Sequence, residues 1–178
     1  MSDTPPPEPV EEPEHEPEDW LPPLILMRDH ASSWAVYVEA VYQFFRQDFY
    51  ASPLLFRGTR VSCRRDPICQ NKEAGFWHCT SEGRDEANRT PDLRRCERIT
   101  WLRAIIEHAG SDDRIDVWHN TLRGEVRYYL WFDEEYLIVL ADRRKYFQLI
   151  TAFTTEPEHT RRKLRREQNE SQREAGNG

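Results

Sequence analysis

Apolar side chains recur every three or four residues between residues 32 and 50, which predicts an amphipathic helix. Ser32 or Ser33 can cap its first turn, and Pro53 prevents the helix from continuing. The apolar positions with this spacing are Trp34, Val38, Val41, Phe45 and Phe49. We expect this mostly aromatic stripe to be core packing and not a ligand site.

A second helix is expected over residues 93–110, LRRCERITWLRAIIEHAG. Asp92 is placed to cap its start, and Gly110 is placed to end it. The inner face is predicted to hold Leu93, Cys96, Ile99, Leu102 or Arg103, and Ile106. The flank of the helix is predicted to hold Arg94, Glu97, Arg98 and Trp101.

Four strand-like runs follow this second helix. They cover residues 114–121, 124–132, 135–143 and 146–154. Because the connectors between them are short, neighbouring strands must run antiparallel. We therefore expect a four-stranded meander.

The other segments are shorter. Residues 54–66 predict a hairpin that turns at Gly58, and GFWHCTS at 75–81 predicts a further strand, followed by a polar loop. Residues 156–172 predict a charged helix with a thin apolar stripe. The predicted fold class is α+β, with helices packed on one face of an antiparallel sheet.

The first twenty residues differ from the rest in composition. They hold eight acidic side chains, six prolines and neither Lys nor Arg. Such a segment cannot bury enough apolar surface to offset its ordering entropy, so we expect a disordered tail over 1–20. A single domain is then expected over 21–171, with a disordered C-terminal tail over 172–178.

The acidic tail also accounts for the negative net charge of the chain. Without its eight negative charges, the formal net charge changes from −7 to about +1. The basic residues are 22 arginines and three lysines, and they cluster over 57–103 and 143–173. Arginine suits phosphate recognition, although a solvated arginine-rich surface explains the composition equally well.

No run approaches the roughly twenty apolar residues that a membrane span needs, and no secretory signal is evident. A zinc site built from Cys63, Cys69, His78 and Cys79 is disfavoured, because these spacings match no common zinc module. We expect reduced thiols in a cytoplasmic protein, with no metal, no cofactor and no membrane partner.

Several motifs resemble one nuclease family. They are GFWHCTSEG, NRTPDLRRCERITWLRAIIE, VWHN, YYLWF, YLIVLADR, LITAF and EHTRRKLRRE. Together they resemble phage-type members of the Barnase–EndoU–colicin–RelE-like (BECR) nucleases over about residues 34–167.

The resemblance implies a four-stranded antiparallel sheet whose concave face carries the site. It also implies metal-independent RNA cleavage and toxin-like, phage or mobile-element biology, often with a neutralising antitoxin or immunity-type protein. The chain lacks the pair of closely placed histidines of the EndoU branch, so a two-histidine mechanism is not expected.

His78 is the expected catalytic acid or base, because histidine exchanges protons readily near neutral pH. Ser81 and Glu82 follow it closely and are candidates for substrate binding. The alternative is a core histidine that is hydrogen-bonded to a neighbour.

Arg94 and Arg98 are expected to share a helix face and to bind one phosphate together. The alternative is that both form surface ion pairs with nearby acids. Thr151 interrupts an apolar strand, and the resemblance implies that its hydroxyl contacts phosphate. Weaker substrate-binding candidates are Arg89, Glu97, Tyr128 and Lys163.

These candidates favour an RNA-cleaving enzyme. Two alternatives stay open, a non-catalytic RNA- or nucleotide-binding module and a protein-interaction domain whose acidic tail forms the contact. The RNA target is not indicated by any motif.

Overall fold

The computed structural model describes residues 19–30 and 33–176. Its helices are α1 (Met27–His30), α2 (Trp34–Arg46), α3 (Ala74–Thr80), α4 (Leu93–Glu97), α5 (Trp101–His108) and α6 (Glu158–Gly176), with a π-helix η1 (Gln47–Ala51) and a 3-10 helix η2 (Glu86–Asn88). Its strands are β1 (Leu55–Phe56), β2 (Thr59–Cys63), β3 (Ser81–Glu82), β4 (Thr90–Pro91), β5 (Ile115–Leu122), β6 (Glu125–Phe132), β7 (Tyr136–Asp142) and β8 (Phe147–Thr154).

The main sheet confirms the predicted meander. Strands β5, β6, β7 and β8 pair antiparallel in chain order, with an irregular register between Val139 and Leu140. The predicted hairpin is also present, because β1 and β2 pair antiparallel and Arg57 and Gly58 adopt positive φ between them. β2 then pairs with β8 in parallel, so the six-stranded sheet is mixed and mostly antiparallel.

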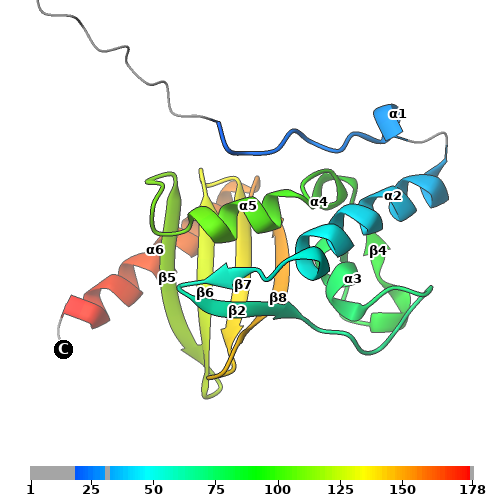
Figure 1. The fold of residues 1–178 in the computed structure, drawn as a ribbon. Coiled ribbons are helices and arrows are strands. Elements are labelled where there is room, and N and C mark those ends of the chain that lie inside the picture. The colour runs from blue at the N-terminus through cyan, green and yellow to red at the C-terminus, as the bar shows by residue number, and fades with distance from the viewer. Residues whose placement is uncertain (1–18, 31–32, 177–178) are drawn as a thin grey trace, which may run out of the picture.

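Helices cover both faces of this sheet and not only the predicted one (Figure 1). Leu130 and Ile138 point to the face that packs with α2, α4 and α5. Trp131 and Val139 alternate with them and pack on the other face with Leu164 of α6. Since β6 and β7 are apolar on both faces, the second face also needs a cover.

The second predicted helix has the expected cap but divides into two. The Asp92 carboxylate accepts from the backbone N–H of Arg94 and of Arg95. The helix breaks at Arg98, whose backbone N–H donates to the carbonyls of Arg95 and Cys96. The Arg98 side chain donates to the Arg94 carbonyl at 3.2 Å. The side chain thus takes the carbonyl that a continuous helix would pair with this N–H.

The segment predicted as a strand at 75–81 is mostly helix α3. Its buried positions include Phe76, Cys79 and Thr80, a spacing of three and four that fits a helix better than alternation. Thr80 and Ser81 donate their hydroxyls to the carbonyls four residues earlier, at 2.9 and 2.6 Å. Thr80, a residue type that favours strands, thus ends the helix, and Ser81 follows it as the C-cap residue.

The ends of the folded region extend beyond the predicted boundaries. Trp20 stacks on His108, with ring centroids 4.2 Å apart, and its indole N–H donates to Asp112 at 2.6 Å. Residues 1–18 of the predicted tail lie outside the described residues. At the other end, α6 continues to Gly176, past the predicted boundary at residue 171.

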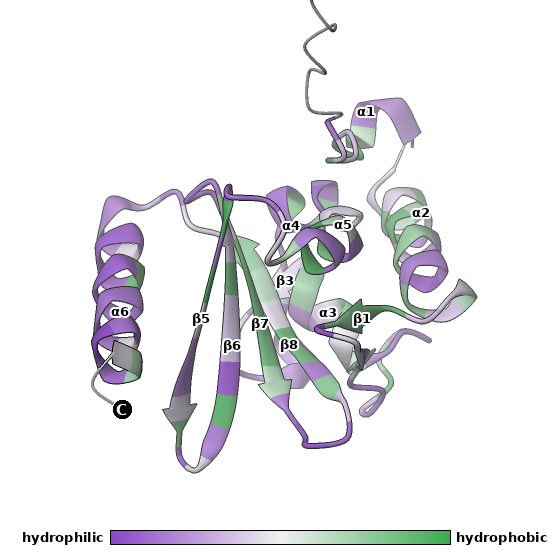
Figure 2. Ribbon diagram, turned by 60° about the vertical axis from the view of Figure 1, so that its left-hand side comes forward, coloured by the Kyte–Doolittle hydropathy of each residue, from purple (hydrophilic) through white to green (hydrophobic). Residues whose placement is uncertain are grey.

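Helix α6 also protects an edge of the sheet. β5 is the last strand in the sheet order, so one side of it pairs with no strand in the part of the chain that the structure describes. Ser171 of α6 donates its hydroxyl to the backbone carbonyl of His119 in β5 at 2.8 Å. Figure 2 shows α6 beside β5, with mostly hydrophilic residues along the helix.

Candidate functional site

Helix α3 is held on the sheet from two directions. The backbone N–H groups of Ala74 and Gly75 donate to the carbonyls of Arg65 and Arg64, at 3.1 and 2.8 Å. At the other end of the helix, the Thr151 hydroxyl donates to the His78 carbonyl at 2.9 Å. These contacts fix the last turn of α3, which carries the His78 imidazole.

The His78 imidazole is bound by Glu86 of η2. Nε2 lies 2.8 and 3.0 Å from the two carboxylate oxygens, and the imidazole side chain retains 16% exposure. Arg64 lies 3.6 Å from the same carboxylate and is 49% exposed. A carboxylate that binds one ring nitrogen fixes the orientation of the ring. It leaves Nδ1 as the nitrogen that can exchange a proton with a bound molecule.

The loop that carries Glu86 is closed by Arg89. Its guanidinium donates to the Ser81 hydroxyl at 3.0 Å, to the Ser81 carbonyl at 2.9 Å and to the Gly83 carbonyl at 2.7 Å. Arg95 donates to the Ser81 carbonyl as well, at 3.0 Å. Burial lowers the pKa of Arg89. These hydrogen bonds give Arg89 a role in shaping the loop. Arg89 also lines the cavity described below, so its substrate-binding role stays a prediction.

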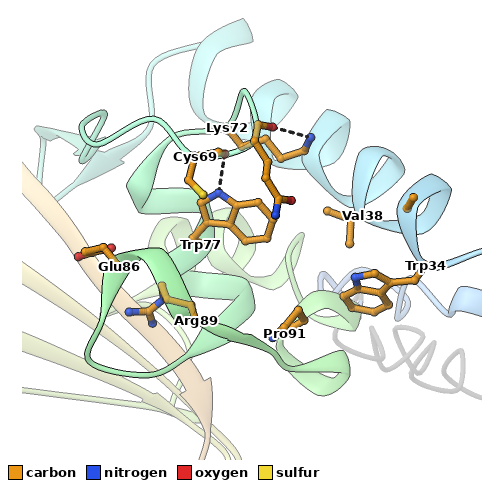
Figure 3. A pocket seen from close by; sticks show the side chains of 10 residues that line it. Trp34, Val38, Cys69, Lys72, Trp77, Glu86, Arg89 and Pro91 are labelled. Atoms are coloured by element: carbon orange, nitrogen blue, oxygen red, sulfur yellow. Dashed lines mark hydrogen bonds between the residues drawn. The ribbon is translucent and has the colours of Figure 1, made fainter.

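A cavity of about 410 Å³ opens beside this loop (Figure 3). Trp34 of α2 and Trp77 of α3 line different sides of it, and Glu86 lies in its wall. The Trp77 indole N–H donates to the Cys69 carbonyl at 2.9 Å, which fixes this ring. Since Glu86 also binds His78, the cavity and the imidazole share one side chain.

The two arginines predicted to bind phosphate together do not meet around His78. Arg94 forms an ion pair with Glu156, which follows β8. Arg98 is buried and donates to Glu135 at 2.7 and 3.2 Å. Both acids come from distant parts of the chain, so these ion pairs could not be inferred from the sequence of the helix. Both arginines thus form ion pairs, as in the alternative, but chiefly with distant acids in place of the expected Glu97 or Asp92.

Three further candidates differ in burial and in their contacts with His78: Thr151, Ser81 and Glu82. The Thr151 hydroxyl contacts the His78 backbone, as described above, and the Ser81 side chain is buried against α3. Glu82 is exposed on β3. Of these three residues, Thr151 is the one with a hydrogen bond to His78 in the structure.

The remaining candidates lie on other elements. Glu97 is partly buried, 3.8 Å from Arg98. Tyr128 packs edge-on against Phe56 and Phe147. Lys163 is exposed on α6, in a groove of about 720 Å³ that Thr151 also lines. None of these contacts joins Glu97, Tyr128 or Lys163 to the imidazole within the residues described.

Sequence reasoning missed Glu86, Arg64 and the two tryptophans of the cavity. Glu86 is eight residues from His78 in a segment predicted as an unstructured polar loop, so no helical or strand period connects the two. Trp34 was assigned to the core, yet it is 37% exposed. The spacing of Phe76 and Cys79 was the one local signal for α3, and it places His78 on the partly exposed side.

Within residues 19–30 and 33–176, no group of three or more His, Cys, Asp or Glu side chains is arranged to hold a metal ion. No helix in this part of the chain has the length and apolar character to cross a membrane. Comparisons of the chain with protein-family models, curated proteins and solved structures found no match.

Proposed function

We propose that the protein cleaves RNA by general acid–base chemistry at His78. The observation that carries this proposal is the His78–Glu86 pair, with Nε2 at 2.8 and 3.0 Å from the carboxylate, beside an open cavity. A partly exposed imidazole held by a carboxylate is an arrangement that proton-transfer enzymes use. The resemblance of the sequence to BECR nucleases supports the choice of RNA as substrate.

In the proposed reaction, Nδ1 of His78 takes the proton from the ribose 2′-hydroxyl. The 2′-oxygen then attacks the adjacent phosphorus, and the bond to the 5′-oxygen breaks. The imidazolium, held in place by Glu86, returns the proton to the departing 5′-oxygen. The products are a 2′,3′-cyclic phosphate and a 5′-hydroxyl, and no further reactant is consumed.

Negative charge develops on phosphorus-bound oxygens during this attack and needs a cation close by. Arg64 is the best placed of the described arginines, because it is 3.6 Å from Glu86 and half exposed. Arg98 is unsuited to this role, since its guanidinium is buried against Glu135. Thr151 acts as a positioning residue, since its hydroxyl is bound to the His78 carbonyl.

The test is cleavage of mixed single-stranded RNA in EDTA by the wild type and by the His78→Ala variant. We expect the rate to fall by about a hundredfold or more, the usual effect of removing a general acid or base. His159→Ala is the matched control, because His159 is exposed on α6, and its rate should equal that of the wild type. The upstream product should carry a cyclic phosphate.

Two results would contradict the proposal. Equal rates for wild type and His78→Ala would mean that His78 does not perform the chemistry. Binding of RNA without any cleavage by the wild type would favour the non-catalytic RNA-binding alternative.

A further inference from the structure

We propose that the cavity between α2 and α3 binds one unpaired nucleobase, so that the substrate is single-stranded at the site of cleavage. This inference rests on the proposed function, and it adds a base-binding subsite to the His78–Glu86 pair. The residues that carry it are Trp34, Trp77, Gln70 and Glu86, all of which line the cavity.

The tryptophans provide flat apolar surfaces for a ring. Trp77 is fixed by its hydrogen bond to the Cys69 carbonyl at 2.9 Å and by edge-on packing with Phe76 at 5.1 Å. Trp34 comes from the first turn of α2 and is 37% exposed, so its indole is accessible from solvent. Figure 3 shows the two indoles on different sides of the cavity. Aromatic side chains in this setting stack bases of any identity.

A tight turn supplies polar groups at the rim. Cys69 and Lys72 exchange backbone hydrogen bonds at 3.0 and 2.9 Å, and Gln70 and Asn71 between them adopt positive φ. This turn places Gln70 on the cavity lining. An amide both donates and accepts, so it can distinguish the polar edges of different bases.

The connection to the reaction is Glu86. It lines the cavity and binds the imidazole of His78, with Arg64 on its other side. His78 is not among the residues that line the cavity, so the proposal places the ribose and phosphate of a bound base past Glu86, the side chain that the cavity and the imidazole share. A base within a duplex has both faces covered by its neighbours and cannot lie against an indole in this way. Single-stranded substrate follows from this requirement.

The test measures binding and not cleavage, so that it stands apart from the test of the proposed function. The probe is a fluorescent single-stranded RNA whose 2′-hydroxyls are methylated, which blocks the reaction. The comparators are an abasic strand of the same length and charge, and the same RNA annealed to its complement. Fluorescence anisotropy gives the affinity of each at one salt concentration.

We expect the wild type to bind the base-containing strand about tenfold or more tightly than the abasic strand or the duplex. Trp34→Ala should lose this preference and keep its affinity for the abasic strand, whereas Trp34→Phe should retain part of it. Gln70→Ala should change the relative affinity for different bases. Tyr146→Ala is the control, because Tyr146 is an aromatic of similar exposure on the β7–β8 turn. Melting curves establish that each variant is folded.

The outcomes separate the two proposals. If the wild type cleaves RNA but Trp34→Ala and Gln70→Ala bind all probes normally, the base site is wrong and the cleavage proposal stands. If Trp34-dependent binding appears without cleavage, the base site stands and the cleavage proposal fails. Equal affinity for single strand, duplex and abasic strand overturns the base site in either case.

Discussion

Replacing Thr151 with valine distinguishes a positioning role from direct contact with phosphate. Valine has nearly the same shape, so the change removes mainly the 2.9 Å hydrogen bond to the His78 carbonyl. A neutral hydrogen bond contributes about 1 kcal/mol net, and its loss lowers the melting temperature of a domain of this size by about 2–4 °C. The same bond fixes the last turn of α3, so the rate of RNA cleavage should fall together with stability.

The measurements are urea unfolding and RNA cleavage under identical buffer conditions. Thr151→Ser keeps the hydroxyl and is expected to retain both stability and activity. Thr154→Val is the control in the same strand, because no hydrogen bond of the Thr154 hydroxyl is found among the described residues. Its cleavage rate should equal that of the wild type.

Two results would refute the positioning role of Thr151. If Thr151→Val loses about a hundredfold in cleavage rate with unchanged stability, then the hydroxyl acts on the substrate itself. Unchanged stability together with an unchanged rate would mean that the hydrogen bond has no role in holding α3.

Four further changes test the packing of the fold. Burial raises the pKa of Asp48 to about 6, so the folded state becomes less stable as pH rises from about 4 to 6. In urea unfolding, Asp48→Asn should raise the free energy of unfolding by about 1–2 kcal/mol at pH 8 and change it little at pH 4. A Cβ on Gly75 would lie 2.8 Å from Cβ of Cys63, so Gly75→Ala should cost about 2 kcal/mol in the same measurement. Trp20→Ala removes the stacking on His108 and should lower the melting temperature. Deletion of residues 1–20 removes the same ring and should also lower it. An unchanged melting temperature in both variants would contradict this packing.

The sequence predicted those elements whose signal is local. The period of Val38, Val41 and Phe45 identified α2, and the short connectors identified the meander from β5 to β8. Asp92 was correctly expected to cap the second helix, because a cap depends on neighbours within three residues.

The site was harder to predict because its contacts are long-range or lie in loops. His78 was singled out, but its partner Glu86 comes from a loop with no period, and the acids that bind Arg94 and Arg98 come from residues 156 and 135. Strand-favouring residues misled the prediction for α3, where hydroxyl groups bond to helix carbonyls. The covering of the second sheet face by α6 follows from packing that the weak apolar stripe of this helix does not reveal.

The contact between α6 and β5 affects how copies of the protein meet each other. An uncovered edge strand offers unpaired N–H and C=O groups to any other strand, and this is a common route to aggregation. Ser171 occupies one such carbonyl, at His119, and the charged helix around it carries Arg165 and Lys163. A chain shortened before residue 158 would expose both this edge and the apolar second face of the sheet. The C-terminal helix thus hinders pairing of β5 with a strand of another copy, and we expect truncated proteins that lack this helix to precipitate.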